Sequence, residues 1–460
     1  MAPVPPISRV VTIAAAAAMG GFLFGFDTAV INGAVGAIGT WSGVGAVQLG
    51  FSVASALLGC AVGAWFAGPI SAKLGRITVM KLAALLFFVT SLACGLVWDI
   101  WSLTVFRLIG GLAVGAASVI APAYIAEVSP AEVRGRLGSM QQLAIVLGIF
   151  VSLLSNYALA QAAGGAGNVL WFGLEAWRWM FMAECIPALL YGVLAFTIPE
   201  SPRFLIGKGR LDEAAQILTQ YVGGSIDEKI ADIRSTLSEE SQMSAAVLRG
   251  PDGKLLPIVL VGMALAVLQQ LVGINVIFYY STMLWEAVGF TESDALLTGV
   301  ITSVTNIATT ILAIALIDKV GRKPLLLVGS IGMAATLGTM AFIFGTAPVE
   351  DGQPVLAAGI GILAVVAANL YVVFFGMSWG PIMWVLLGEM FSNKIRAYAI
   401  AIAGAANWIA NFIVSQTFPP LAAMSLGLAY GIYTAMALLS FFFVAKFIKE
   451  TRGMELEEMV

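Results

Sequence analysis

Three amide side chains lie close together within one apolar stretch of the chain. Gln269, Gln270 and Asn275, with Tyr279 four residues further on, belong to the uncharged run 255–285. That run is long enough to cross a bilayer core, which takes roughly 20 helical residues. Amides in hydrocarbon are costly unless they face a wet cavity or polar partners. Each amide offers both a donor and an acceptor, so the cluster predicts a site for a neutral polyhydroxy ligand. The alternative is that the amides only hydrogen-bond neighbouring helices together.

Two sequence features predict breaks in membrane-spanning helices. On a straight helix at about 100° per residue, Gln270 and Asn275 would point roughly 140° apart. Gly273 between them predicts a bend or break that relaxes this geometry. Gly380-Pro381 predicts a second break in a later span, because proline lacks the backbone donor that a helix interior needs.

The composition is that of a polytopic membrane protein. Hydrophobic residues make up 60% of the 460 residues and charged residues only 11%, where a soluble domain has about 25% charged residues. The fold class predicted is therefore all-α. Apolar runs of spanning length number twelve: 10–36, 47–71, 78–98, 102–126, 137–160, 178–199, 255–286, 295–317, 325–345, 359–388, 396–420 and 427–448.

The basic residues sort to one side of this twelve-span arrangement. Of the 23 Lys and Arg residues, all but Arg107 and Arg178 fall on the side of the two termini. The positive-inside rule makes that side cytoplasmic. We therefore expect a multi-pass protein of the cell membrane, in contact with lipids and with both termini in the cytoplasm. The net charge of −3 gives no reason to expect a nucleic-acid partner.

The chain contains no histidine, which excludes histidine metal sites, Ser-His catalytic pairs and histidine proton relays. Any proton chemistry must then use carboxylates. Cys60, Cys94 and Cys185 lie in the apolar runs and are expected to be small packing residues. No nucleophile–base pair or metal cluster stands out, so we expect neither enzymatic activity nor a cofactor or metal.

The two halves of the chain repeat the same charged motifs. Lys73-Leu74-Gly75-Arg76 follows the second run and Lys319-Val320-Gly321-Arg322 the eighth. Six spans per half make the repeats parallel, which is the major facilitator arrangement with a substrate site between halves. We expect a six-helix half at 1–199, a cytoplasmic helical linker at 200–254, a second six-helix half at 255–448 and a cytoplasmic tail at 449–460. The repeated charges are interpreted as interdomain gating latches rather than simple anchors: Arg76, Glu127, Arg134, Glu200, Arg203, Asp318, Arg322, Glu389, Arg396 and Glu450.

Three ionisable residues fall inside spans at a similar predicted depth. Asp27, Arg107 and Glu184 each lie very roughly 8–14 Å from the outer edge, at 1.5 Å per helical residue. A lone charge there costs several kcal/mol, so we expect pairing among them. Pairing fits a proton-coupling switch, and a static salt bridge is the alternative.

The chain resembles the sugar porter family of the major facilitator superfamily over nearly its whole length. The stretch 177–187 is similar to the bacterial xylose/proton symporters of that family, and the whole chain also resembles its facilitative glucose transporters. Ala72 departs from the family pattern, which usually has Asp there, and this predicts a weaker latch in the N-terminal half. The motifs that carry the resemblance are Gly25-Phe26-Asp27-Thr28, Arg134-Gly135, Pro199-Glu200-Ser201-Pro202-Arg203, the 269–275 tract, Asp318-Lys319-Val320-Gly321-Arg322-Lys323 and Glu450-Thr451-Arg452-Gly453.

The resemblance implies a set of sugar contacts drawn from both halves. An indole offers a flat apolar face and one N–H donor, which suits a sugar. Tyr280 and Trp408 could instead be packing residues. The implied contacts are Phe24, Gln142, Gln269, Gln270, Asn275, Tyr279, Asn306, Trp384, Asn407 and Trp408.

The resemblance further implies proton-coupled uptake of a hexose or pentose by alternating access, in a monomer. The glucose facilitators carry an uncharged Asn at the position of Asp27, so the carboxylate here favours symport. A uniporter of the same fold is the first alternative. A sugar receptor that signals without transport is the second, and a long cytoplasmic tail would favour it.

Overall fold

The structure is a computed structural model that describes residues 7–130, 134–242, 248–250, 252–350, 353–391 and 395–451. Within these residues, twelve helical segments are long and apolar enough to cross a membrane. The predicted all-α, twelve-span fold is therefore confirmed. Residues 452–460 of the predicted tail and parts of the predicted linker lie outside the described residues.

The N-terminal half contains six spans, of which the sixth is made of two helices. The first five are α1 (Ile7–Ser42), α2 (Ala46–Leu74), α3 (Arg76–Gly95), α4 (Ile100–Val128) and α5 (Arg134–Ala163). A short hairpin of β1 (Val169–Trp171) and β2 (Leu174–Glu175) then leads into the sixth span, α6 (Ala176–Ala183) with α7 (Cys185–Thr197).

The C-terminal half repeats this plan with two divided spans. Its elements are α11 (Pro257–Leu271) with α12 (Ile274–Glu286), α13 (Glu292–Val320), α14 (Arg322–Gly345), the hairpin β3 (Val349–Glu350) and β4 (Gln353–Pro354), α15 (Ala358–Gly376) with α16 (Trp379–Glu389), α17 (Arg396–Met424) and α18 (Leu426–Phe447).

Both helix breaks predicted from the sequence are present. Gly273 separates α11 from α12 in the left-handed conformation, with φ 85° and ψ 21°, which glycine adopts without steric cost. The tenth span breaks at Met377 and Ser378, just before Gly380-Pro381. Pro381 then occupies the first turn of α16, where a missing N–H costs least.

A third break, at Glu184 between α6 and α7, was not predicted. Pro187 explains it: a proline in that position cannot donate to the carbonyl of Ala183 and crowds it. The break therefore places an acidic residue at a helix end within the span.

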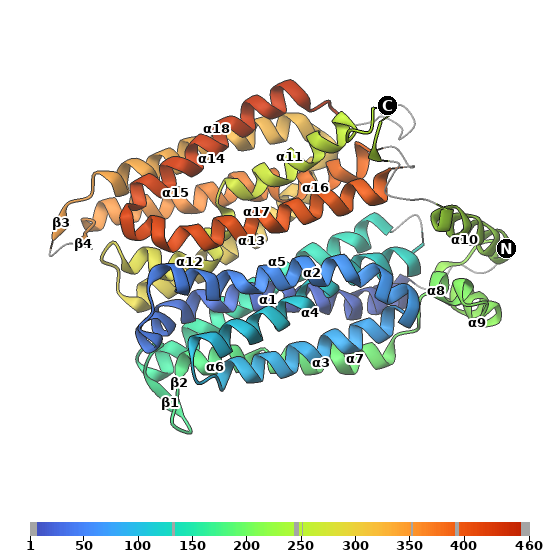
Figure 1. Cartoon of the computed structure of the whole chain (residues 1–460), viewed down its shortest axis with the longest axis horizontal. Helices are drawn as coiled ribbons and strands as arrows, with labels where there is room; N and C mark the ends of the chain where they lie inside the picture. The colour runs from blue at the N-terminus through green and yellow to red at the C-terminus, as the bar shows by residue number, and fades with distance from the viewer. Residues whose placement is uncertain are drawn as a thin grey trace.

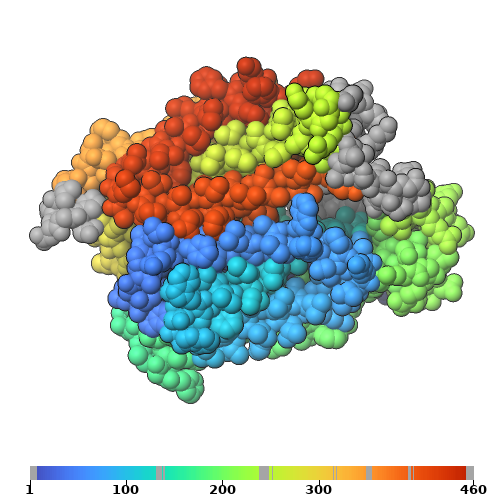
Figure 2. Space-filling view, in the orientation of Figure 1, coloured from blue at the N-terminus to red at the C-terminus, as the bar shows by residue number. Residues whose placement is uncertain are grey.

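The two halves lie side by side along their whole length (Figure 1). Helices α17 and α2, α13 and α5, and α12 and α1 pack against each other across the boundary. Figure 2 shows α17 lying along α2 on one face of this boundary. Within the N-terminal half, α2 and α4 approach so closely that a Cβ at Gly111 would collide with the carbonyl oxygen of Ala56. Glycine at this position is what allows the close packing.

Helices between the two halves gather at one end of the bundle, and both hairpins lie at the other (Figure 1). The helices between the two halves are α8 (Pro202–Gly207), α9 (Leu211–Ile217), a π-helical turn η1 (Leu218–Val222) and α10 (Ile226–Gln242). Helices α9 and α10 each carry two acidic residues in their first turn, which stabilise a helix N-terminus. A small apolar core that includes Leu205, Ile206, Ala214 and Leu218 holds these helices together.

Candidate functional site

Four amide side chains form one connected hydrogen-bond network at the break of the seventh span. Asn275 on α12 donates from Nδ2 to Oε1 of Gln270 at 2.6 Å. Gln270 donates from Nε2 to Oδ1 of Asn407 at 3.1 Å and to Oε1 of Gln269 at 3.2 Å. Asn407 on α17 in turn donates to Oε1 of Gln269 at 2.8 Å. The break at Gly273 thus brings α11, α12 and α17 to one polar centre.

The same network is tied to the break in the tenth span. Gln269 donates from Nε2 to the carbonyls of Trp379 at 3.0 Å and Gly380 at 3.2 Å, both at the start of α16. Asn407 also donates to the carbonyl of Ala266 at 2.9 Å. Gln269, Gln270 and Asn407 are buried, and Asn275 is half-buried. Two divided spans therefore meet at these amides.

Three other predicted sugar contacts are not joined to this network by hydrogen bonds among the described residues. Trp384 on α16 is 43% exposed. Asn306 on α13 is half-buried, with Oδ1 3.8 Å from where a Cβ of Gly376 would lie. Gln142 on α5 is half-buried in the opposite half.

Aromatic residues close the predicted site from both halves. Phe24 of α1 lies against Trp408 of α17, with ring centroids 5.8 Å apart. Tyr279 is buried on α12. The hydroxyl of Tyr280 donates to the carbonyl of Ser415 at 2.8 Å, a contact that fits the packing alternative.

At the end bearing the hairpins, which we name the outer end, hydrogen bonds seal the two halves together. Asn32 of α1 is fully buried and uses both ends of its amide. Nδ2 donates to Oγ of Ser281 at 2.8 Å, and Oδ1 accepts the backbone N–H of Thr282 at 2.9 Å. The backbone N–H of Ala166 donates to Glu292 at 2.8 Å. Gln416 donates to the carbonyl of Val47 at 3.1 Å.

We name the pairing of Asn32 with Ser281 and Thr282 the outer latch. Sequence analysis missed it, although a lone asparagine five residues after Asp27 in an apolar span is a visible signal. The latch joins α1, which carries Asp27, to α12, which carries Asn275 and Tyr279. The outer end of the molecule is therefore closed in this structure.

Asn32→Ala is expected to shift the molecule towards states with an open outer end. Two hydrogen bonds are lost, each with a net contribution of about 0.5–1.5 kcal/mol, so the closed population falls by roughly tenfold relative to the open one. The measurement is the distance between spin labels at the exposed positions Trp98 and Met424, in a background without the native cysteines. Asn369→Ala is the matched control, because that amide bonds Thr305 within one half. Identical distance distributions for Asn32→Ala and wild type would contradict the latch.

The three buried ionisable residues lie near one another but are not directly paired. Glu184 accepts a hydrogen bond from Oγ of Ser91 at 2.7 Å. Arg107 donates from Nη2 to the carbonyl of Val53 at 3.5 Å, and its guanidinium lies 5.8 Å from the ring centre of Phe181. These contacts hold the guanidinium away from the carboxylates, although the charges interact electrostatically through space.

The expected pairing of Asp27 with Arg107 therefore needs correction for this conformation. Among the described residues, no ion pair of 4.0 Å or less involves Asp27, Arg107 or Glu184. Oδ2 of Asp27, Nε of Arg107 and Oε1 of Glu184 are all buried without a hydrogen-bond partner. Buried charges without partners are costly. Protonation of a carboxylate, or the approach of a counter-charge, is therefore expected to change how Asp27, Arg107 and Glu184 are arranged.

The charged motifs at the opposite end form a compact cluster in the N-terminal half. Arg76 binds Glu127 with two hydrogen bonds, of 2.8 and 3.1 Å. Glu200 accepts the backbone N–H groups of Arg76 at 2.9 Å and Ile77 at 3.2 Å. The hydroxyl of Ser201 donates to Glu127. This cluster therefore ties the starts of α3 and α8 to the end of α4.

The C-terminal half builds the same cluster at equivalent positions. Arg322 binds Glu389 with two hydrogen bonds, of 2.8 and 3.1 Å. Glu450 accepts the backbone N–H groups of Arg322 and Lys323, both at 3.0 Å. The hydroxyl of Thr451 donates to Glu389 at 2.6 Å. The internal repeat seen in the sequence is thus a repeat of hydrogen-bond partners.

None of the bonds just given joins the N-terminal half to the C-terminal half, because the partners lie within one half or in the linker or tail directly attached to it. Arg396 likewise donates to the carbonyl of Phe391 in its own half. Arg203 lies in the first turn of α8. The side chains of Arg134 and Asp318 lie outside the described residues. The clusters brace each half, and a role between halves stays a prediction.

Comparisons with known proteins agree on one family. The model of the family described as "Sugar (and other) transporter" matches residues 13–460. A glucose transport protein of Synechocystis sp. is 57% identical over 98% of this chain and 97% of its own length. The D-xylose-proton symporter of Escherichia coli is 38% identical over 98% of this chain and 95% of its own. The inward open conformation of the xylose transporter XylE from E. coli matches the fold with a TM-score of 0.82 and 36% identity, covering 98% and 99% of the two chains.

Proposed function

This chain belongs to the sugar porter family of the major facilitator superfamily, and we propose that it carries a neutral hexose or pentose across the membrane together with protons. Membership of that family makes it a multi-pass membrane transporter rather than an enzyme. The observation that carries the proposal is the network of four amides at the meeting point of two divided spans.

The network suits hydroxyl groups because it already consists of paired donors and acceptors. Sugar hydroxyls both donate and accept, so they can take over amide–amide bonds one for one. The bond between Asn275 and Gln270 is the one most easily exchanged, since Asn275 is half-buried and makes no other hydrogen bond with a described residue. A sugar held there would pull on α12, the half-helix that carries Ser281 and Thr282 of the outer latch. Sugar binding would then favour closure of the outer end, because both involve α12.

Proton coupling is assigned to Asp27 and Arg107, with Glu184 as the neighbouring carboxylate. When Asp27 is ionised, its attraction for Arg107 is strong in a poorly solvated span. A proton from outside neutralises Asp27 and frees the guanidinium for the carbonyl of Val53 and the ring of Phe181. The contacts of Arg107 in the present outer-closed structure fit this released state. Because Asp27 and the outer latch share α1, the proton's arrival and closure of the outer end become coupled steps.

The remaining assignments follow from this topology. We place the helices α8–α10 and both termini in the cytoplasm, on the side of the basic residues. The proposed division is an N-terminal half at 1–199, a linker at 200–254, a C-terminal half at 255–448 and a tail at 449–460. The transporter is proposed to work as a monomer in the lipid of the cell membrane.

Trp384→Ala is expected to reduce sugar uptake at least tenfold, whereas Trp384→Phe should keep part of it. A phenyl ring still covers the C–H face of a sugar, but it lacks the indole N–H. Because Trp384 is 43% exposed in this structure, truncation should leave folding intact. Initial uptake rates in proteoliposomes are the measurement. Equal rates for Trp384→Ala and wild type would make Trp384 a wall residue without a role in binding.

The proposed function itself is tested by uptake into proteoliposomes of a panel of labelled hexoses, pentoses and charged sugars. We expect saturable uptake of at least one neutral monosaccharide and none of sugar phosphates or sugar acids. Protein-free liposomes give the background. The absence of saturable uptake for the whole neutral panel would reject the transport assignment, and specific binding without uptake would favour a receptor.

A further inference from the structure

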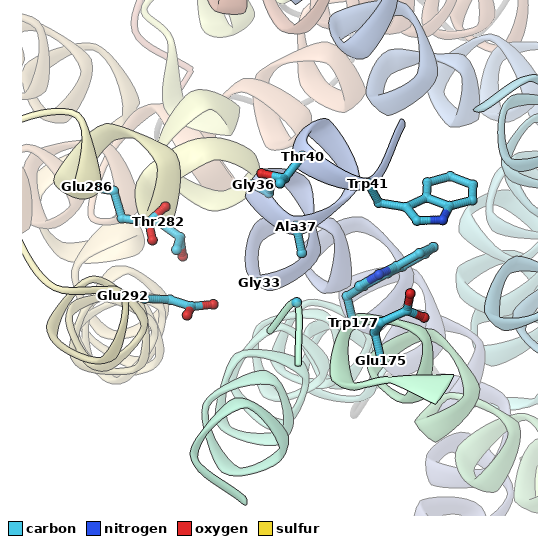
Figure 3. A pocket seen from close by; sticks show the side chains of 11 residues that line it. Gly33, Gly36, Ala37, Thr40, Trp41, Glu175, Trp177, Thr282, Glu286 and Glu292 are labelled. Atoms are coloured by element: carbon cyan, nitrogen blue, oxygen red, sulfur yellow. The ribbon is translucent and has the colours of Figure 1, made fainter. Parts of the chain in front are cut away.

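A cavity of about 480 Å³ lies between the two halves at the closed outer end. One wall comes from α1, with Gly33, Gly36 and Thr40, and the opposite wall comes from α12 and α13, with Glu286 and Glu292 (Figure 3). Thr282 also lines the cavity and is held by Asn32 of the outer latch. The cavity therefore sits directly on the latch, on its outer side.

Trp177 and Glu286 each bring an unused hydrogen-bonding group to this cavity. Trp177, which lines the cavity, is fully buried, and its indole N–H has no hydrogen-bond partner. Figure 3 shows the indole nitrogen on the edge of the ring that faces Ala37. Glu286 makes no hydrogen bond with another described residue, and its Oε2 lies 3.4 Å from where a Cβ of Gly36 would be.

The other two carboxylates of the cavity already have partners. Glu175 pairs with Arg178 at 2.6 Å, and Glu292 accepts the backbone N–H of Ala166 at 2.8 Å. Trp177 thus offers a free donor from the N-terminal half, and Glu286 offers a free acceptor from the C-terminal half. A hydroxyl-bearing ligand can satisfy both, because each hydroxyl donates and accepts. A cation would be attracted by the carboxylates but would leave the indole N–H of Trp177 without a partner, and an anion would be repelled by the carboxylates.

We propose that this outer cavity is a second, low-affinity site for a neutral monosaccharide that arrives from outside; the proposal rests on the proposed function for the nature of its ligand. The volume lies within the range of small-molecule sites. Few groups contact the ligand, and those that do include no network like the central amides, so binding is at least tenfold weaker than at the central site.

Because its walls come from both halves, the site exists only while the outer end is closed. A ligand that binds one state better than another shifts the population towards that state. Sugar in the cavity therefore opposes reopening of the outer end, which the next round of uptake needs. The uptake rate should therefore pass through a maximum and fall at least twofold at high external sugar concentration. The outer site would thus cause substrate inhibition of transport.

The test is a saturation-transfer NMR titration of the full-length protein in nanodiscs with D-glucose and with D-xylose. Wild type should show a tight and a weak phase for the transported sugar. Gln270→Ala/Asn275→Ala should remove the tight phase and keep the weak one. Glu286→Ala should weaken the weak phase at least fivefold, as should Trp177→Phe, which removes the N–H and keeps a smaller aromatic ring in its place. Asp294→Ala is the matched control, an outer-end carboxylate that does not line the cavity, and should change neither phase.

A single phase in wild type, or a weak phase untouched by both Glu286→Ala and Trp177→Phe, overturns the second site and leaves the proposed function standing. A tight phase that survives in Gln270→Ala/Asn275→Ala shows instead that the central site has been misplaced. In that case the comparison of Glu286→Ala with Asp294→Ala still decides whether the outer cavity binds sugar.

Discussion

Asp27→Asn is expected to abolish accumulation of sugar against its gradient when a proton gradient is imposed. The amide mimics the protonated carboxyl and has no proton to release. The substitution leaves the amide network untouched, so sugar binding and exchange at equilibrium should persist within about twofold of wild type. Accumulated label in proteoliposomes, with and without an imposed pH difference, is the measurement.

Two further variants sharpen this result. Asp294→Asn changes an exposed outer carboxylate in the same way and should accumulate sugar like wild type. Arg107→Ala should also uncouple, with a greater loss of stability, because removing a buried charge strands the opposite charge at a cost of about 3–5 kcal/mol. Gradient-driven accumulation by Asp27→Asn at the wild-type level would remove Asp27 from the coupling mechanism.

Gln270→Ala is expected to lower sugar affinity at least tenfold, and Asn275→Ala to lower it in the same direction. Losing a hydrogen bond and stranding its partner costs on the order of 1–3 kcal/mol. Gln270 hydrogen-bonds Gln269, Asn275 and Asn407, whereas Asn275 hydrogen-bonds one described residue, Gln270, so Gln270→Ala should have the larger effect. Calorimetric titration of the purified variants measures both.

The matched control is Asn369→Ala, which removes a half-buried amide that bonds Thr305 and the carbonyl of Val365 in its own half. It should bind sugar with wild-type affinity. All three variants should purify with wild-type yield, since each removes an uncharged side chain. Unchanged affinity in both Gln270→Ala and Asn275→Ala would move the sugar site elsewhere in the molecule.

The sequence predicted the spans and the break at Gly273 because those features are local. Apolar length determines a span, and a glycine between two amides that would otherwise point apart determines the break. The cause of the break at Glu184 is equally local, because it is Pro187. The sequence prediction used this proline only as the last residue of the stretch 177–187 that resembles the family. Gly380-Pro381 predicted the break in the tenth span closely, although α15 ends at Gly376, slightly earlier.

The partners across the bundle could not be predicted in this way. Asn32 and Ser281 are 249 residues apart. The local sequence around either residue does not identify the other as its hydrogen-bond partner. Glu127 pairs with Arg76, 51 residues earlier in the chain, because helix α4 returns beside the start of α3. Depth estimates placed Asp27, Arg107 and Glu184 at one level, but depth leaves the rotation of each helix open. Direct contact depends on that rotation and on the conformational state.

The most direct test of the central claim is sugar-stimulated proton movement in proteoliposomes that contain a pH-sensitive dye. The wild-type protein, without any imposed gradient, should acidify the lumen when its sugar is added outside, and Asp27→Asn should not. Sugar uptake by the wild type with no change in luminal pH would contradict proton coupling and make the protein a uniporter of the same fold.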